Sequence, residues 1–178
     1  MRIRALWAVA AAVLTLVPSV ATAAASSGSG PPASHAVCKL EFSWSLRVAT
    51  SMTPTSGRFT STSGTFTCRG TVFGRSAVDR PGRLVASETY GPDTCLAGHG
   101  RGPFKATVNT ATGPITVRGV FYERRVGATG ATTGTLTARR RGAARFRGSY
   151  ALLPTSGQNC FTTPVKSGTV SATVVLTG

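Results

Sequence analysis

The chain has 178 residues, of which 20 are Lys or Arg and 5 are Asp or Glu, so its formal net charge is +15. Five carboxylates and two histidines leave few groups for acid–base catalysis or for a metal site, and the sequence carries no cofactor-binding motif. The charge favours anionic partners, although arginines that serve only solubility would produce the same balance.

The first residues have the order of a secretory signal peptide. Arg2 and Arg4 form a basic start, and residues 5–17 form an apolar run that is too short to span a bilayer. Residues 21–23 (ATA) are a cleavage site of the small-x-small type. We therefore expect residues 1–23 to be removed and the protein to be secreted into the extracellular medium.

A leader and a single domain follow the signal peptide. Cleavage after Ala25 is the alternative to cleavage after Ala23. Residues 24–36 are rich in Ser, Pro and Gly and predict a flexible leader. Residues 37–178 are long enough to form one domain with its own core, and they contain no lipid-anchor or stop-transfer segment, so we expect no membrane span after processing.

The domain begins with a long period-2 pattern. From Val37 to Thr50 the even positions are mostly apolar and the odd positions mostly polar, which predicts a half-buried strand. Turn signals divide the remainder into seven further expected strands, at 58–74, 83–90, 98–110, 115–125, 131–140, 144–153 and 167–177. No part of the domain has helical periodicity.

Eight long, successive strands predict an all-β fold, an eight-stranded antiparallel up-and-down barrel, because closure removes the two sheet edges. Glycines in the middle of strands, such as Gly119 and Gly134, fit the bends of a small barrel. A two-sheet β-sandwich is the alternative.

The four cysteines predict two disulfides. Cys38, Cys68, Cys95 and Cys160 lack the close spacing of zinc ligands. In an up-and-down barrel Cys38 and Cys68 lie near one end, whereas Cys95 and Cys160 lie in loops at the other end. Bridged Cα atoms are about 4.4–6.8 Å apart, so Cys38 is expected to pair with Cys68 and Cys95 with Cys160.

The barrel interior is the first candidate binding site. Eight-stranded barrels are either filled by side chains or hold one small ligand. If the barrel is hollow, the inward phase predicts Phe42, Trp44, Phe121 and Tyr150 as pocket residues, and Glu88 and Glu123 as polar groups within it. The alternatives are a plain core and, for the glutamates, an exposed rim position paired with Arg101 or Arg124.

An arginine-rich run is the second candidate site. The sequence TARRRGAARFRGSY predicts a hairpin whose outward phases set Arg139 and Arg141 close to Arg145 and Arg147 across the ladder. Lys105 and Arg118 extend this basic surface. The only aromatics of the run, Phe146 and Tyr150, point inward, so nucleic acid is disfavoured and an anionic wall polymer or acidic glycan is favoured.

Several segments carry a family resemblance. SGTFTCRGTVFG, ETYGPDTCLAGHGRG, GPITVRGVFYERR and FRGSYALLPTSGQNCFTTPVKSGTV resemble small secreted four-cysteine β-proteins of actinomycete-type bacteria. In architecture the chain is similar to calycin-like and allene-oxide-cyclase-like barrels. This resemblance implies a compartment and a fold but no activity, and it transfers no site residue. Neocarzinostatin-type apoproteins differ, because their cysteines close much shorter loops.

Together these patterns predict a secreted, non-catalytic barrel. It binds either a small apolar molecule in its interior or an anionic polymer on its arginine-rich surface. Two alternatives remain: an isomerase or hydrolase that uses Glu88, Glu123 or His99, and a structural extracellular protein without a specific ligand.

Overall fold

The computed structural model describes residues 33–178, and the predicted signal peptide lies outside this range. The described chain forms nine β-strands and no helix, and hence no helix that could cross a membrane. The strands are β1 (His35–Thr50), β2 (Thr55–Val72), β3 (Arg75–Ala77), β4 (Gly82–Asp93), β5 (Ala97–Val108), β6 (Ile115–Val126), β7 (Thr129–Ala138), β8 (Gly142–Pro154) and β9 (Val165–Thr177).

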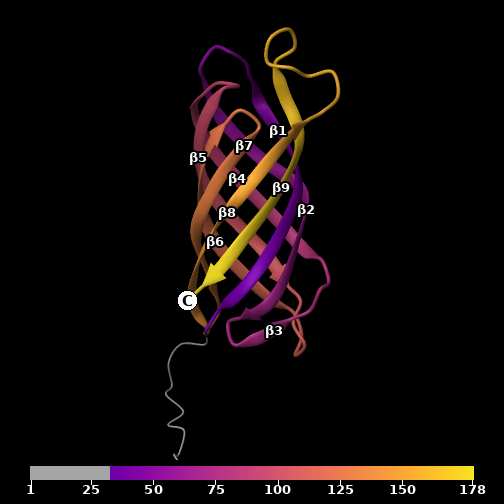
Figure 1. Ribbon diagram of the computed structural model, residues 1–178, viewed down its shortest axis with the longest axis vertical. Coiled ribbons are helices and arrows are strands. Elements are labelled where there is room, and N and C mark those ends of the chain that lie inside the picture. Colours follow the sequence, from indigo (N-terminus) through magenta and orange to yellow (C-terminus); the bar gives the residue numbers. More distant parts are fainter. Residues whose placement is uncertain (1–32) are drawn as a thin grey trace, which may run out of the picture.

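The eight long strands form a closed antiparallel ring. Their order is β1-β9-β8-β7-β6-β5-β4-β2, and a further β1–β2 pairing closes it, while short β3 extends from β2. The crossing strands of the two walls are visible in Figure 1. The predicted eight-stranded architecture is confirmed. The sequence did not predict β3, because three residues are too few to show a periodicity. In addition, β1 starts at His35, inside the stretch expected to be a flexible leader.

Both predicted disulfides are confirmed. Cys38 lies directly opposite Cys68 in the β1–β2 ladder, with 4.0 Å between their Cα atoms. Cys95 in the β4–β5 loop is bonded to Cys160 in the β8–β9 loop, with 5.8 Å between the Cα atoms. One bridge therefore fastens the first hairpin near the lower end of Figure 1, and the other joins two loops at the upper end. Two disulfides indicate an oxidising environment.

The lower half of the barrel holds a large cluster of buried apolar side chains. Its largest fully buried side chains include Val72, Phe73, Val117, Leu136 and Leu176, which belong to one continuous apolar cluster. A second cluster surrounds Trp44, Phe59 and Tyr150 in the upper half, and it does not fill the interior. The fold thus places a closed floor beneath a hollow upper half.

Candidate functional site

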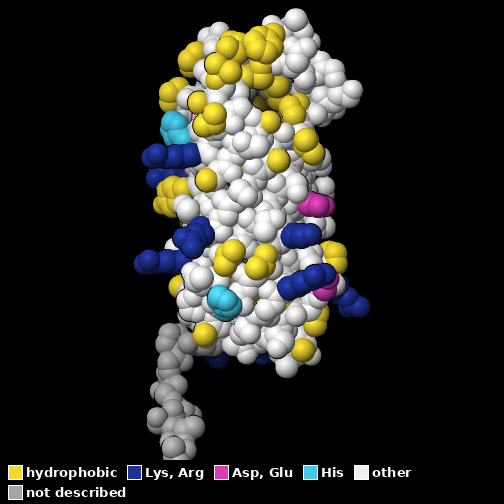
Figure 2. Space-filling view, viewed as in Figure 1, with side chains coloured by type: hydrophobic (Ala, Val, Ile, Leu, Met, Phe, Trp, Pro, Cys, Tyr) yellow, Lys and Arg dark blue, Asp and Glu magenta, His cyan; other side chains and the backbone are white. Residues whose placement is uncertain are grey.

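The upper half of the barrel encloses a cavity of about 270 Å³. Its lining runs from Leu136 and Leu176 of the packed floor up to Ala128 and Pro154, which are exposed. The cavity therefore opens at the end that carries the Cys95–Cys160 disulfide. Figure 2 shows hydrophobic side chains gathered at this same end of the molecule. The barrel is neither completely filled nor an open tube.

Most of the cavity wall is apolar and aromatic. All four predicted pocket residues line it: Phe42, Trp44, Phe121 and Tyr150. The Phe42 ring stacks on Phe59, with 6.0 Å between ring centroids and 11° between ring planes. The sequence pattern does not reveal Phe59, because register shifts interrupt the pairing of β2 with β4 and break the period-2 alternation along β2.

Two glutamates meet inside this apolar wall. Glu88 of β4 is only 3% exposed, and Glu123 of β6 also faces the cavity. Strand β5 lies between them, and the residue opposite Glu123 is Gly100. A Cβ atom at Gly100 would overlap the Glu88 carboxyl group. The glycine therefore leaves the space in which the carboxyls of β4 and β6 approach each other across β5.

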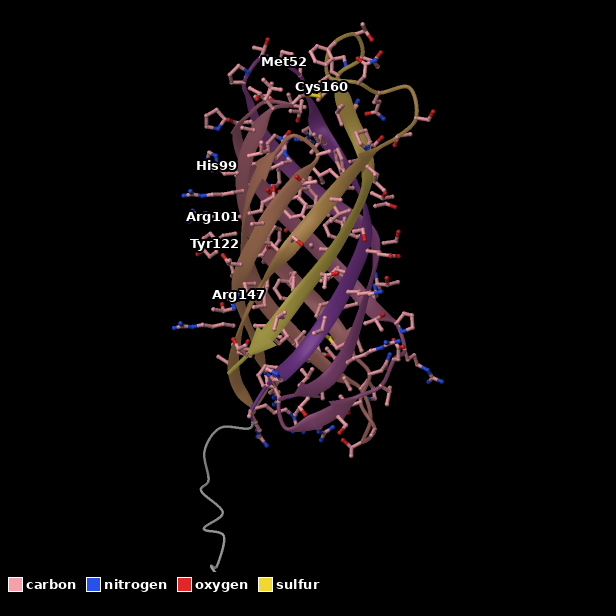
Figure 3. All side chains as sticks on the ribbon, viewed as in Figure 1. Met52, His99, Arg101, Tyr122, Arg147 and Cys160 are labelled. Carbon is pink, nitrogen blue, oxygen red and sulfur yellow. A yellow bond between two sulfur atoms is a disulfide. The ribbon has the colours of Figure 1, made fainter. Side chains whose placement is uncertain are left out.

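The three glycines of the segment GHGRG face the interior, where neighbouring groups leave no room for a side chain. Gly98, Gly100 and Gly102 hold the inward positions of β5, where added Cβ atoms would overlap Asp93, Glu88 and the Ser87 carbonyl. The intervening His99 and Arg101 point outward and are exposed, as Figure 3 shows at the left of the barrel. Of the three residues expected for an acid–base site, Glu88 and Glu123 come together and His99 does not.

The surroundings of the glutamates favour their protonated forms. Burial raises the pKa of Glu88 to about 10, and the negative charge of Glu123 contributes to this rise. Burial also raises the pKa of Glu123, against the opposing effects of its neighbours Glu88, Tyr150 and Arg125. At neutral pH the pair therefore holds at least one proton, and one carboxyl can donate a hydrogen bond.

Two further buried donors belong to residues that line the cavity. Trp44 Nε1 has no hydrogen-bond partner among the described residues, and Tyr150 Oη has none of ordinary geometry, although it lies near enough to Glu123 to lower the pKa of that carboxyl. Burial, followed by the charge of Glu123, raises the pKa of Tyr150, so its hydroxyl stays protonated. An unpaired buried donor costs about 1–3 kcal/mol. A ligand atom that accepts a hydrogen bond would offset this cost.

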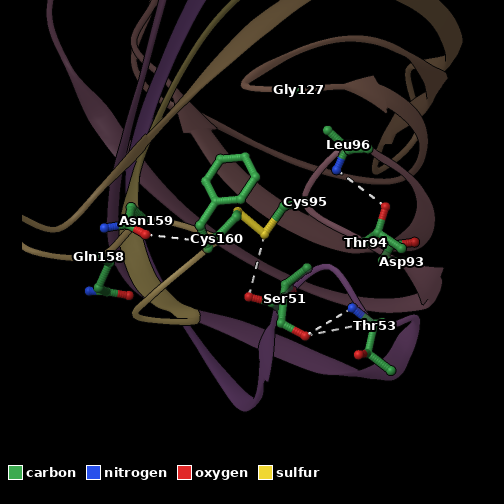
Figure 4. The surroundings of a disulfide bond; sticks show 12 residues. Ser51, Thr53, Asp93, Thr94, Cys95, Leu96, Gly127, Gln158, Asn159 and Cys160 are labelled. Carbon is green, nitrogen blue, oxygen red and sulfur yellow. Dashed lines mark hydrogen bonds between the residues drawn. A yellow bond between two sulfur atoms is a disulfide. The ribbon is translucent and has the colours of Figure 1, made fainter.

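Arg125 holds the mouth of the cavity together. Its guanidinium lies 3.5 Å from the Asp93 carboxylate, and both side chains are buried. It also donates to the carbonyl oxygens of Thr94 at 2.8 Å, Cys95 at 3.3 Å and Gly127 at 3.0 Å. These bonds connect the end of β6 to the β4–β5 loop and to the β6–β7 turn, which are drawn around the disulfide in Figure 4.

The alternative in which the glutamates lie exposed at the rim and pair with Arg101 or Arg124 is wrong. Arg101 and Arg124, the expected partners of rim glutamates, are exposed on the outer wall, and Glu88 is buried inside. Arg125 is the inward residue and pairs with Asp93. The signal was present, because Phe121, Glu123 and Arg125 continue one period-2 phase to the end of β6.

The predicted basic surface exists, but its geometry differs from the expectation. Lys105 lies directly opposite Arg118, and both are exposed. Arg139 and Arg141 lie in the turn between β7 and β8 and not in the ladder. Arg145 faces Thr135, and Arg147 faces Thr133. The expectation that arginines oppose arginines across this hairpin is therefore wrong, because β7 ends at Ala138, before the run begins.

An exposed aromatic residue accompanies the basic surface. Tyr122 of β6 is 53% exposed and lies directly opposite Arg101 on β5 and Thr133 on β7. Thr133 in turn faces Arg147, so the outer wall carries a row of Arg101, Tyr122, Thr133 and Arg147. Figure 3 labels Arg101, Tyr122 and Arg147 of this row. Tyr122 lies outside the arginine run, on β6, so the pattern of that run does not reveal it.

Comparison with known proteins adds no relative. No family model, no curated protein and no solved structure matches this chain.

Proposed function

We propose that this protein binds a small, mostly apolar molecule that carries one polar group. The observation that supports the proposal is the apolar cavity of about 270 Å³ with a cluster of polar groups in its wall. Ligand pockets usually combine apolar walls with a few polar groups that fix orientation, and they measure about 300–1,000 Å³. The ligand is therefore smaller than a typical drug molecule. We further propose that the protein is secreted, which agrees with the two disulfides.

The polar cluster specifies where the polar group of the ligand sits. Trp44 Nε1, Tyr150 Oη and a protonated glutamate offer donors, whereas the ionised partner of the glutamate pair is an acceptor. A hydroxyl or carbonyl group matches these donors without adding a second buried negative charge. We therefore propose an apolar alcohol or ketone as the ligand class.

The test is a titration with N-phenyl-1-naphthylamine, a neutral apolar fluorophore that reports transfer from water. We expect saturable binding with one site per chain. Trp44 is the only tryptophan after residue 23, so energy transfer from Trp44 to the probe will locate it in the barrel. A Trp44→Phe variant should lose the transfer signal. Non-saturable binding would contradict the proposal and leave the structural alternative.

A pair of variants on β9 provides the matched control. Ala172 is buried and lines the cavity, whereas Thr173 beside it is exposed on the outer wall. Ala172→Leu adds volume inside the cavity and should weaken probe binding by about tenfold or more, since even one methylene matters in a close-packed interior. Thr173→Leu should bind as tightly as the unaltered protein. Equal binding by both variants would place the probe elsewhere.

The outer wall supports a second candidate function, binding of an anionic glycan. Here the observation is a surface of exposed cations around Tyr122: Arg101, Lys105, Arg118, Arg124, Arg145 and Arg147. The exposed carboxylates of the described chain are Glu41 and Asp79, which lie on other strands and loops, so none neutralises this surface. Because salt screens the attraction between this surface and an anionic glycan, we expect the affinity for the glycan to fall as the salt concentration rises.

Retention on an immobilised sulfated glycan tests this second candidate. Replacing Arg145 and Arg147 by Gln should lower the salt concentration needed for elution. Replacing Arg58 and Arg47 by Gln removes the same charge from β1 and β2 and serves as the control. Unchanged retention of the first variant would mean that this surface is merely solvated.

A further inference from the structure

The cavity mouth is surrounded by the most exposed large hydrophobic side chains of the described chain. Phe161 is 81% exposed, Val126 77%, Leu153 60% and Leu96 58%. We call these four residues the apolar rim. Every other large hydrophobic side chain of residues 33–178 is exposed to a smaller fraction. Monomeric soluble proteins rarely gather apolar side chains on their surface unless the surface contacts something.

The rim residues come from two loops and from the ends of strands β6 and β8, and these segments are fastened together. Leu96 and Phe161 each follow a cysteine of the Cys95–Cys160 disulfide. The Leu96 carbonyl accepts a hydrogen bond of 2.8 Å from Gly127 N, beside Val126. Leu152 N, beside Leu153, donates to the Ala128 carbonyl at 2.7 Å. The exposed apolar groups therefore form one cross-linked end of the barrel and not a set of independent loop tips.

A band of cations lies just behind the apolar rim. Five exposed basic side chains lie within a few residues of the mouth ends of their strands: Arg47, Arg58, Arg101, Arg124 and Lys166. The carboxylates of this end, Asp93, Glu88 and Glu123, face inward, and Asp93 is ion-paired with Arg125. The exposed Asp79 pairs with Arg69 near the opposite end of the barrel. Within the described chain, no exposed carboxylate thus accompanies the rim.

We propose that this end docks onto an anionic lipid bilayer. The apolar rim enters the interface between headgroups and acyl chains, while the basic band contacts the phosphates. A second copy of the chain is a poorer occupant, because head-to-head contact would bring two basic bands together. Docking aims the cavity mouth at the hydrocarbon, so an apolar ligand enters without crossing water. This last step rests on the ligand binding proposed above, whereas docking itself does not.

Sedimentation with lipid vesicles tests the docking. We expect the protein to sediment with vesicles of phosphatidylglycerol mixed with phosphatidylcholine, to do so less as salt rises, and to bind pure phosphatidylcholine weakly. Replacing Leu96 or Phe161 by Ser should weaken binding by about tenfold each, since burial of such a side chain contributes about that factor or more. Replacing Arg124 by Gln should weaken binding to the anionic vesicles alone.

The control variants replace apolar residues far from the mouth. Val175→Ser on the outer wall and Val37→Ser near the opposite end remove similar exposed side chains and should leave sedimentation unchanged. Equal binding by rim and control variants would overturn the proposal, as would self-association that requires Leu96 and Phe161. The fluorophore titration in the absence of vesicles separates the two proposals. Probe binding without vesicle binding overturns docking alone, and vesicle binding without probe binding overturns ligand binding alone.

Discussion

At the residue scale, the polar part of the cavity depends on the absence of a side chain at Gly100 of β5. Gly100 has no side chain, and the Glu88 carboxyl occupies the space where its Cβ atom would be. Glu123 lies directly opposite this glycine on the next strand. Two carboxyls thus share a mostly apolar interior, and burial raises the pKa of both. A structural core gains nothing from this arrangement, whereas a binding site gains polar groups at a defined depth.

Substitution of Gly100 by Ala tests this packing. We expect the free energy of unfolding to fall by about 1–3 kcal/mol, because the new methyl group overlaps the Glu88 carboxyl. In a Glu88→Ala background the same substitution should cost much less, since the atoms nearest to the added Cβ all belong to the Glu88 side chain. Urea unfolding of the four proteins of this cycle measures both values. An equal cost in the two backgrounds would show that the Glu88 side chain is not the obstacle.

The buried pair also predicts a dependence of stability on pH. An unfolded Glu titrates near pH 4.3, whereas burial raises the pKa of folded Glu88 to about 10. Above about pH 4.3 the unfolded state releases a proton that the folded state keeps, so this group destabilises the fold increasingly as pH rises.

Replacing Glu88 by Gln should therefore stabilise the protein at pH 8, by about 1–3 kcal/mol, and should have no such effect at pH 4. Glu41 is exposed, so Glu41→Gln is the control and should change little at either pH. Thermal and urea unfolding at the two pH values provide the comparison. A Glu88→Gln variant that is less stable at pH 8 would indicate an ionised Glu88 with a partner.

At the element scale, the two disulfides connect different kinds of segment: one joins paired strands and the other joins two loops. Cys38–Cys68 joins two strands that already pair along their length. Cys95–Cys160 joins the β4–β5 loop to the β8–β9 loop and spans 65 residues of sequence, against 30 for the other bridge. Arg125 reinforces the same loops through carbonyl oxygens at the mouth. The mouth is therefore held in shape by one covalent bond and one buried guanidinium.

Removal of either disulfide by paired Cys→Ser substitution should lower the free energy of unfolding by about 2–4 kcal/mol. The loss should be larger for Cys95–Cys160, by about 0.6 kcal/mol, because each doubling of loop length adds about that much closure entropy. Urea unfolding of both variants measures the difference. A larger loss at Cys38–Cys68 would mean that strand pairing, and not loop closure, dominates the effect of the bridges.

At the scale of the whole molecule, the barrel divides into a packed floor and a hollow, cross-linked mouth. A continuous cluster of buried apolar side chains occupies the lower half, and the lining of the cavity reaches exposed residues at the upper end. The outer wall is basic on β5, β6 and β8, and the apolar rim surrounds the mouth. Interior, wall and rim thus offer three chemically distinct surfaces, and each can be altered without touching the others.

Ligand binding should stabilise the whole fold, because only the folded barrel has a cavity. At a free concentration of N-phenyl-1-naphthylamine about 100 times its dissociation constant, the free energy of unfolding should rise by about 2.7 kcal/mol. The Ala172→Leu variant should show a much smaller rise at the same concentration, and Thr173→Leu the full rise. A rise that is equal in all three proteins would indicate binding outside the cavity.

The sequence by itself determined the eight long strands, most of their inward phases and the disulfide pairing. Alternation of apolar and polar residues is a local property, and antiparallel neighbours are successive in the chain, so Cys38 and Cys68 could be placed opposite each other by counting. The same phase predicted Trp44 and Tyr150 inside, and it left Glu88 and Glu123 between the interior and the rim.

Only the tertiary structure decided the features that depend on packing volume or on the distance between strands. These are the cavity, the contacts of its polar residues and the apolar rim. The upper barrel is hollow because its side chains do not fill the space above the floor, which no periodicity reports. Glu88 and Glu123 meet because Gly100 leaves room on the strand between them, and Arg125 binds Asp93 because two loops converge there. The apolar rim gathers residues from three separate regions of the chain, which only ring closure and the Cys95–Cys160 bridge bring together.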